Sequence, residues 1–146
     1  MIEELNVTPT IGVESAKAWQ AISRIGGLER WFPIIAACTV SGSGVGAVRH
    51  MTLADGGEMQ DRIDLIDHAE QTLKYTRFES PFPVRSYQGS VEVRDAGPGK
   101  TTLSWTVVID VDQEHRQSLG ELITNALSDG IKGLEQELQG QQQAQQ

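Results

Sequence analysis

Residues 119–138 read LGELITNALSDGIKGLEQEL, and this stretch decides the fold. Its apolar side chains recur every three or four residues, which is the spacing of one face of an α-helix. The residues of this apolar face are Leu119, Leu122, Ile123, Ala126, Leu127, Ile131, Leu134 and Leu138. The pattern predicts one long C-terminal helix whose apolar face another part of the chain must cover.

The chain before this helix has a different periodicity. From Ile34 to Val111 apolar and polar residues alternate, and Gly, Asp and Pro interrupt the alternation at regular intervals. Such a pattern is typical of antiparallel strands joined by hairpins. The expected strands are 35–41, 47–54, 58–66, 72–79, 85–95 and 101–111, preceded by a first strand at 5–11.

Two short helices are expected after the first strand. Residues 14–23 have helical apolar spacing that ends at Gly26-Gly27, and a second turn over Leu28–Phe32 stops at Pro33. A sheet with one apolar face and a single long helix must place that helix across the sheet. The sequence therefore predicts an α+β fold in which a seven-stranded curved antiparallel sheet wraps around the long C-terminal helix.

Length and charge limit the classes of protein that fit. The chain has 146 residues, the size of one average domain, and we expect that domain to span residues 1–138. Residues 139–146 contain six Gln and predict a disordered tail. The 12 Lys and Arg against 20 Asp and Glu give a net charge of -8, with no basic run to bind nucleic acid. Because the sequence has neither a long apolar run nor a secretory signal, we expect no membrane span and a cytoplasmic location.

Metal and cofactor sites are not expected. The single cysteine, Cys38, and the three histidines, His50, His68 and His115, do not follow a metal-ligand spacing. The glycines within residues 42–46 connect two strands, and no helix N-terminus follows them to hold a phosphate. The sequence therefore predicts neither a bound metal nor a cofactor.

Hairpin pairing places charged residues on the apolar face of the sheet. A three-residue loop at 55–57, with Gly57 in the left-handed conformation, and a second loop at 68–70 determine which residues lie opposite each other. The expected pairs are Met51 with Asp61, Arg49 with Ile63, Ile63 with Tyr75, and Asp61 with Arg77. The apolar members of these pairs identify the face as the inward one.

Three charges on this inward face therefore need partners. An isolated ion in an apolar interior costs several kcal/mol, so we expect Asp61 to pair with Arg77 directly opposite and with Arg49 one step diagonal. Two cations around one carboxylate leave an excess positive charge that could meet a ligand carboxylate, enolate or phenolate. In the alternative interpretation, the three residues form a closed ion-pair network that only fixes the register of the sheet, or Arg77 reaches water at a strand end.

Short motifs along the chain also occur in a recognisable order. They are AWQAI at 18–22, GLERWFP at 27–33, GAVR at 46–49, DRI at 61–63, Asp67, LKY at 73–75, Tyr87, and Ser104-Trp105. Across residues 3–138 this order resembles the SRPBCC superfamily of helix-grip proteins. That superfamily includes START-like lipid-transfer domains, the birch pollen allergen family and polyketide cyclase-like proteins. The nearest resemblance is to a small bacterial branch grouped with polyketide cyclases and with accessory proteins of methanol oxidation.

The resemblance implies a hydrophobic cavity between helix and sheet but leaves the activity open, because members include ligand carriers, hormone receptors, cyclases and lyases. We expect the cavity to bind a small hydrophobic or amphipathic molecule. Gly130, on the apolar face of the helix, either lets the sheet approach closely or leaves room for the ligand. The expected ligand-binding residues are Arg49, Met51, Asp61, Ile63, Tyr75, Arg77, Tyr87, Val91, Trp105, Val107, Ala126 and Gly130.

Two other functions remain open at this stage. In a cyclase or lyase/dehydratase of the polyketide cyclase kind, Arg49 and Arg77 would stabilise an enolate while Asp61 or a Tyr moves a proton. An interaction domain for a protein partner would be indicated by an exposed apolar patch around Trp31 and Phe32.

Overall fold

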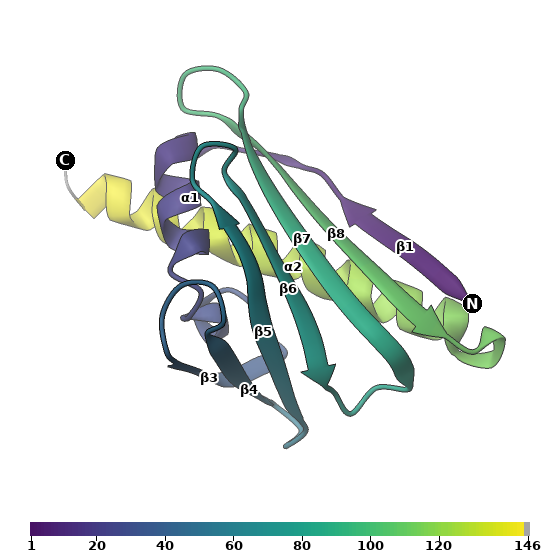
Figure 1. Cartoon of the computed structure of the whole chain (residues 1–146). Coiled ribbons are helices and arrows are strands. Elements are labelled where there is room, and N and C mark those ends of the chain that lie inside the picture. The colour runs from purple at the N-terminus through teal and green to yellow at the C-terminus, as the bar shows by residue number, and fades with distance from the viewer. Residues whose placement is uncertain (145–146) are drawn as a thin grey trace.

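One antiparallel sheet and one long helix make up most of the molecule (Figure 1). The computed structural model describes residues 1–144. The strands are β1 (Ile2–Val7), β2 (Thr10–Ile11), β3 (Ile35–Ser41), β4 (Val48–Leu53), β5 (Glu58–Asp67), β6 (Thr72–Glu79), β7 (Val84–Asp95) and β8 (Thr101–Val111). The helical elements are α1 (Ser15–Ser23), the 3-10 turn η1 (Leu28–Arg30) and α2 (Gln113–Ala144).

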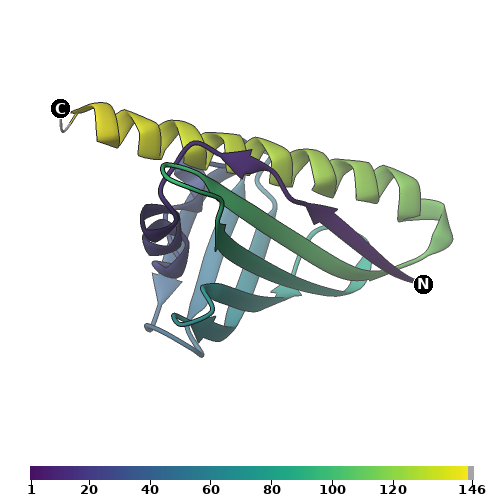
Figure 2. The same cartoon turned by 90° about the horizontal axis from the view of Figure 1, so that it is seen from above.

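Strands β3 to β8 form an antiparallel meander, and β1 pairs with the last of them, β8. The strand order in the sheet is β1-β8-β7-β6-β5-β4-β3, and the short β2 also pairs with β8. In Figure 2, α2 lies across one face of the curved sheet, while α1 lies toward one of its ends. The predicted α+β fold, with a curved antiparallel sheet against a long C-terminal helix, is confirmed.

Two elements differ most from the expected boundaries. The first strand starts at Ile2 and is divided into β1 and β2 by Pro9, which lacks the N–H that a continuous strand would need. Helix α2 continues to Ala144, beyond the expected end of the domain at 138, and Gln139 Nε2 donates to the Gly12 carbonyl at 3.1 Å. Residues 145–146 of the expected tail lie outside the described residues, and the domain boundary stays a prediction.

The register of the β4–β5 hairpin corrects one predicted set of pairs. Arg49 lies opposite Asp61, and Met51 lies opposite Met59, so the pairing is shifted by two residues from the prediction. The cause is the turn, because Gly56 (φ 94°) rather than Gly57 adopts the left-handed conformation. A shift of two keeps every side chain on its predicted face and changes only its partner.

The β5–β6 hairpin follows the predicted register near the charges. Asp61 lies opposite Arg77 and Ile63 opposite Tyr75. A bulge between Ile63 and Leu65 then shifts the pairing by one residue, and Leu65 is left 37% exposed. Asp61 therefore has an arginine directly opposite on each of its two neighbouring strands.

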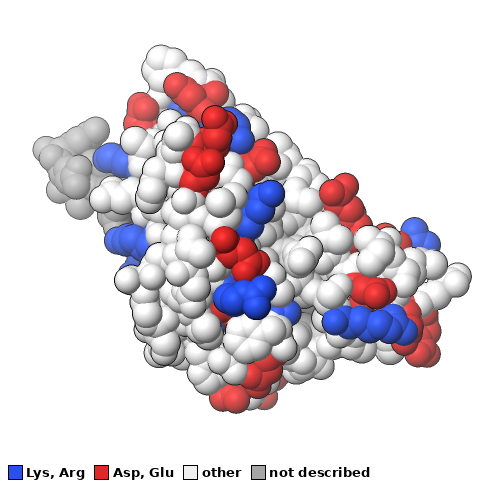
Figure 3. Space-filling model, in the orientation of Figure 1, with Lys and Arg blue, Asp and Glu red and all other residues white. Residues whose placement is uncertain are grey.

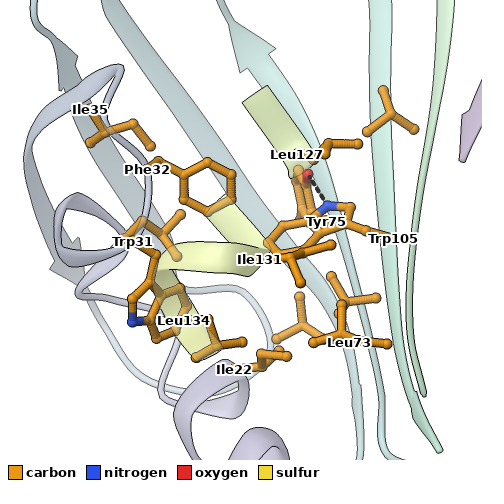
Figure 4. Close-up of a cluster of buried hydrophobic side chains, with 14 of the residues drawn as sticks. Ile22, Trp31, Phe32, Ile35, Leu73, Tyr75, Trp105, Leu127, Ile131 and Leu134 are labelled. Atoms are coloured by element: carbon orange, nitrogen blue, oxygen red, sulfur yellow. Dashed lines mark hydrogen bonds between the residues drawn. The ribbon is translucent and has the colours of Figure 1, made fainter. Parts of the chain in front are cut away.

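The core fills most of the space between α2 and the sheet. Leu127, Ile131 and Leu134 of α2 are buried, and Figure 4 shows them facing Phe32 and residues of the sheet. Most of the apolar face of the helix is thus covered as its spacing predicts, with Leu122 left 39% exposed.

The turn at Trp31 and Phe32 packs directly on α2. A Cβ at Gly130 would lie 2.1 Å from the Phe32 ring, and one at Gly133 would lie 2.2 Å from the Trp31 carbonyl oxygen. Trp31 and Phe32 are consequently only 3% and 5% exposed, so the exposed patch that would have indicated a protein partner is not formed there. Gly130 makes room for Phe32, which was neither of the two roles expected for it.

The outer face of the sheet is polar and mixed in charge. Figure 3 shows Lys and Arg side chains beside Asp and Glu on this face, and Arg62 Nε lies 2.8 Å from Asp64 Oδ1. None of the helices among the described residues is both long and apolar enough to span a membrane.

Candidate functional site

A small apolar cavity lies between the sheet, the N-terminal half of α2 and the chain after α1. Its volume is about 50 Å³, which is room for one or two water molecules. The lining residues come from eight parts of the chain and are Leu28, Phe32, Ile34, Ile35, Arg49, Leu53, Met59, Tyr75, Arg77, Phe82, Tyr87, Trp105, Leu122, Ile123, Ala126 and Leu127.

The cavity approaches solvent at one end of the sheet. Leu122 of α2 is 39% exposed, and Ile34 and Phe82 are half-buried, whereas most other apolar lining residues are buried. Phe82 belongs to the loop 80–83 between β6 and β7. These three apolar side chains mark the side of the cavity nearest to solvent.

The charged cluster forms one wall of this cavity. Asp61 is fully buried and accepts hydrogen bonds from Arg49 Nε at 2.8 Å, Arg77 Nε at 2.7 Å and Arg77 Nη2 at 3.2 Å. Arg49 also donates from Nη1 to the Ile25 carbonyl oxygen at 3.1 Å. The Arg49 and Arg77 side chains are 3% and 9% exposed, so all three charges are largely removed from water.

The surroundings determine the charge state of the cluster. Burial by itself raises the pKa of the Asp61 carboxyl, but the guanidiniums of Arg77 and Arg49 outweigh burial and hold that pKa below its ordinary value. Asp61 is therefore an anion at neutral pH, and the cluster carries one positive charge in excess. Burial also raises the pKa of the Tyr87 hydroxyl, although Arg77 opposes this, so Tyr87 is protonated at neutral pH.

Aromatic rings hold the two guanidiniums in place. The Arg49 guanidinium carbon lies 4.6 Å from the centre of the Tyr75 ring, and that of Arg77 lies 4.3 Å from the centre of the Tyr87 ring. The Tyr75 hydroxyl accepts a hydrogen bond from Trp105 Nε1 at 3.1 Å, drawn as the dashed line in Figure 4. Gly89, opposite Tyr75 on β7, leaves the space that the Tyr75 ring occupies, since a Cβ there would lie 2.0 Å from the ring.

The expected ligand-binding residues divide into three groups. Those that line the cavity are Arg49, Tyr75, Arg77, Tyr87, Trp105 and Ala126. Asp61 lies behind the two arginines and binds them without lining the cavity. The remaining expected residues are Met51, Ile63, Val91, Val107 and Gly130, which lie in the filled part of the core. Strand alternation predicts the face on which a residue lies, but not whether the space in front of it is filled.

Several lining residues were not expected from the sequence. Leu122, Ile123 and Leu127 belong to the apolar face of the helix, but their position along the sheet depends on tertiary packing. Phe82 stands between Pro81 and Pro83 in a predicted loop, and this lone aromatic residue was the available signal. Leu28, Ile34 and Ile35 flank Trp31 and Phe32, and the fold brings all of this segment to the cavity.

The described residues contain no group of three or more His, Cys, Asp or Glu side chains that could hold a metal ion. The chemistry of the site is that of two guanidiniums, one carboxylate and two phenols in an apolar surrounding.

A comparison with protein families identifies the family to which the chain belongs. The family described as "Polyketide cyclase / dehydrase and lipid transport" matches residues 3–139. The chain belongs to this family of helix-grip proteins, and the resemblance to the SRPBCC superfamily is confirmed. Among curated proteins, none matches the sequence.

Solved structures from bacteria and plants have the same fold. The protein XoxI from Bacillus cereus is 23% identical, with a TM-score of 0.83 over 92% of this chain and 94% of that chain. The Zhui aromatase/cyclase from Streptomyces sp. R1128 is 16% identical, with a TM-score of 0.83 over 95% of this chain and 94% of that chain. Norcoclaurine synthase from Thalictrum flavum is 16% identical, with a TM-score of 0.79 over 97% of each chain. At these identities the similarity establishes the fold alone.

Proposed function

We propose that this protein binds a small amphipathic molecule, with an aromatic or other apolar body and one acidic group, in the cavity between the sheet and α2. The observation that carries the proposal is the excess positive charge of the Arg49, Asp61 and Arg77 cluster on the wall of an otherwise apolar cavity. A purely structural ion pair would need one cation for one carboxylate, and here a second cation is buried beside it.

The hydrogen-bonding inventory supports an acidic ligand group. Arg77 uses Nε and Nη2 on Asp61, and Arg49 uses Nε and Nη1 on Asp61 and Ile25. Neither Arg77 Nη1 nor Arg49 Nη2 makes a hydrogen bond to the described residues, and both arginines line the cavity. Because a guanidinium donates planar pairs of N–H bonds, a carboxylate, enolate or phenolate fits these unused donors.

The other walls of the cavity are apolar, which supports a ligand with an apolar body. Phe32 and Trp105 meet edge to face with ring centres 5.5 Å apart, and Tyr75 and Tyr87 lie beyond them toward the arginines. Apolar side chains of α2 close the opposite wall. Burying an aromatic body here would remove apolar surface from water, while the arginines select its orientation. A family whose description includes lipid transport is consistent with such cargo.

A second candidate is an enzyme of the cyclase or lyase/dehydratase kind, because the guanidinium of Arg77 lies over the ring of the protonated Tyr87 and both residues line the cavity. Together they could donate to a developing enolate. Binding is favoured over catalysis because Asp61, the strongest candidate base, accepts three hydrogen bonds from arginines that lower its pKa. The same fold in an aromatase/cyclase keeps this candidate open.

A matched pair of probes tests the binding proposal. We expect 2-naphthoate to bind more tightly than the neutral 2-naphthamide, as measured by titration calorimetry. Arg77→Met should weaken 2-naphthoate binding by about tenfold or more and leave 2-naphthamide binding nearly unchanged. Arg62→Met is the control, because Arg62 lies on the outer face and its side chain is 54% exposed.

Equal affinity of the wild-type protein for both probes, or failure of both to bind, would contradict the proposal. The enzymatic candidate would instead be favoured if the purified protein converted a polyketide or aldehyde substrate and Asp61→Asn abolished conversion while retaining the binding of 2-naphthoate.

A further inference from the structure

The cavity is too small for the ligand that the proposed function requires. About 50 Å³ holds one or two waters, whereas a bicyclic aromatic acid needs several times that space. One wall must therefore move before such a ligand enters. This inference rests on the proposed function and concerns which wall moves and what holds it.

The segment 24–35 is the longest part of the cavity wall that lies mostly outside the strands and α2. Neighbouring strands are hydrogen-bonded from β1 to β3, although β6 and β7 pair only over residues 72–76 and 88–92, and α2 is one unbroken helix. Before β3, which starts at Ile35, the segment contains only the three-residue turn η1. It nevertheless contributes four lining residues, which are Leu28, Phe32, Ile34 and Ile35.

This segment begins with a strained residue. Ile25 has φ 73°, a left-handed conformation that a β-branched residue rarely adopts. The Gly26 N–H donates to the Arg24 carbonyl at 2.8 Å across it, which makes a tight γ-turn. Ile25 is only 4% exposed, so the turn is enclosed by the fold. A conformation of this kind persists only where surrounding contacts hold it.

The contact that holds Ile25 comes from the charged cluster. Arg49 Nη1 donates to the Ile25 carbonyl at 3.1 Å, while Nε of the same guanidinium donates to Asp61 at 2.8 Å. At the far end of η1, Trp31 Nε1 donates to Glu137 of α2 at 3.2 Å. The segment is thus attached to the cavity wall through Arg49 and to α2 through Trp31. Arg30 Nε also donates to Glu137 at 3.1 Å, and the Ala54 N–H donates to the Ile34 carbonyl at 2.9 Å.

We propose that Arg49 is a positioning residue that controls the opening of the cavity. Its hydrogen bond to Ile25 holds the strained turn and keeps Leu28 and Phe32 against the sheet. An acidic ligand group that binds the free Nη2 of Arg49 draws the guanidinium toward the cavity and breaks the hydrogen bond from Nη1 to the Ile25 carbonyl. Ile25 then relaxes to negative φ, and the segment moves outward on its attachment to α2, which enlarges the cavity on the side where the acid binds.

Hydrogen–deuterium exchange of two lysine variants tests this role. Arg49→Lys keeps the charge beside Asp61 but has one ammonium group in place of the fork that reaches both Asp61 and Ile25. Arg77→Lys is the matched control, because Arg77 also binds Asp61 but donates no hydrogen bond to segment 24–35. We expect amides of residues 25–32 to exchange about tenfold faster or more in Arg49→Lys than in wild type and in Arg77→Lys. Amides of β7 should exchange alike in all three proteins.

Binding kinetics provide a second readout that a merely structural role would not move. In stopped-flow fluorescence, 2-naphthoate should associate faster with Arg49→Lys than with wild type, whereas Arg77→Lys should change mainly its dissociation rate. If Arg49→Lys does not fold, the wild-type protein is compared with and without 2-naphthoate, and exchange of residues 25–32 should rise with 2-naphthoate but not with 2-naphthamide.

Equal exchange of residues 25–32 in the two lysine variants, or no response of these amides to bound 2-naphthoate, would overturn the role of Arg49. Failure of the wild-type protein to bind 2-naphthoate would overturn the proposed function, and exchange in the unliganded variants would still report separately whether Arg49 holds the turn.

Discussion

Apolar and polar residues alternate along the whole sheet, but the two ends of its inner face differ in packing. At one end, Leu73, Val93 and Leu103 are at most 1% exposed, and none of them lines the cavity. At the other end, Arg77 and Tyr87 face a cavity. Helix α1 packs against β7, whereas the loop 80–83 lies at the opposite end of the sheet (Figure 1).

The number of covering elements accounts for the difference. Near α1 the sheet is covered by two helices, and Figure 4 shows Ile22 of α1 and Leu134 of α2 on the same side as Leu73 of β6. Trp19 Nε1 also donates to His68 Nδ1 at 3.1 Å, which attaches α1 to the turn between β5 and β6. Near the loop 80–83, α2 and the segment 28–35 cover the sheet without a second regular helix. Strand alternation thus determines which side chains lie on the inner face, and the packing of helices determines where the space in front of them is filled.

The largest effect is expected from removing the carboxylate at the boundary between the two ends. Asp61→Ala leaves two buried arginines without their anion and should lower the free energy of unfolding by about 3–5 kcal/mol. Asp64→Ala is the matched control, because Asp64 lies on the outer face of the same strand with its side chain 35% exposed, and should cost no more than about 1 kcal/mol. Denaturant unfolding measures both. Similar losses in the two variants would mean that water reaches the cluster.

Leucines of α2 compare the filled and open ends directly. Leu134 is fully buried at the filled end, and Leu134→Ala should cost about 2–5 kcal/mol because it leaves a cavity. Leu122 is 39% exposed at the open end, and Leu122→Ala should cost less than about 1 kcal/mol. Thermal or denaturant unfolding of the two variants is the measurement. If Leu122→Ala cost as much as Leu134→Ala, the open end would be packed like the rest of the core.

Acid should reduce the contribution of the charged cluster to the free energy of unfolding. The folded-state pKa of Asp61 lies below its unfolded value of about 3.9, so its ionised form stabilises the fold above about pH 4. That contribution is lost as the pH falls through the folded-state pKa. The free-energy difference between wild type and Asp61→Asn should therefore be smaller at about pH 3 than at about pH 7. An unchanged difference between these conditions would show that Asp61 is not the titrating group.

The sequence predicts on which face of the sheet each charged residue lies, but it does not predict every cross-strand partner correctly. The alternation of side chains along the strands places Arg49, Asp61 and Arg77 on one face. The two-residue error in the β4–β5 register does not change this, because a shift of two keeps every side chain on its side of the sheet. The direct pairing of Arg49 with Asp61 was missed because it depends on which glycine, Gly56 or Gly57, adopts positive φ. Both glycines can adopt it, so the local sequence does not distinguish the two turns.

The cavity itself was only partly predictable. Tyr75, Tyr87 and Trp105 follow from strand alternation, but Phe82 reaches the cavity from a loop. The position of the loop is set by packing between elements that are distant in sequence. The hydrogen bond from Arg49 to Ile25 joins residues 24 positions apart and leaves no periodic signal.

Two glycines of α2 provide the smallest test of the same comparison. A Cβ at Gly120 would meet only Leu5 Cδ2 at 3.5 Å, an ordinary contact, whereas one at Gly133 would lie 2.2 Å from the Trp31 carbonyl oxygen. Gly120→Ala should therefore raise the free energy of unfolding by about 0.5–1 kcal/mol, because Ala favours the helix and meets no obstacle. Gly133→Ala gains the same helical preference but must displace the backbone of the packed turn, so it should be net destabilising by about 1–3 kcal/mol. Chemical denaturation of both variants gives the signs. If both were stabilising, the turn would yield without cost, and the contact between Trp31 and α2 would not fix the segment that closes the cavity.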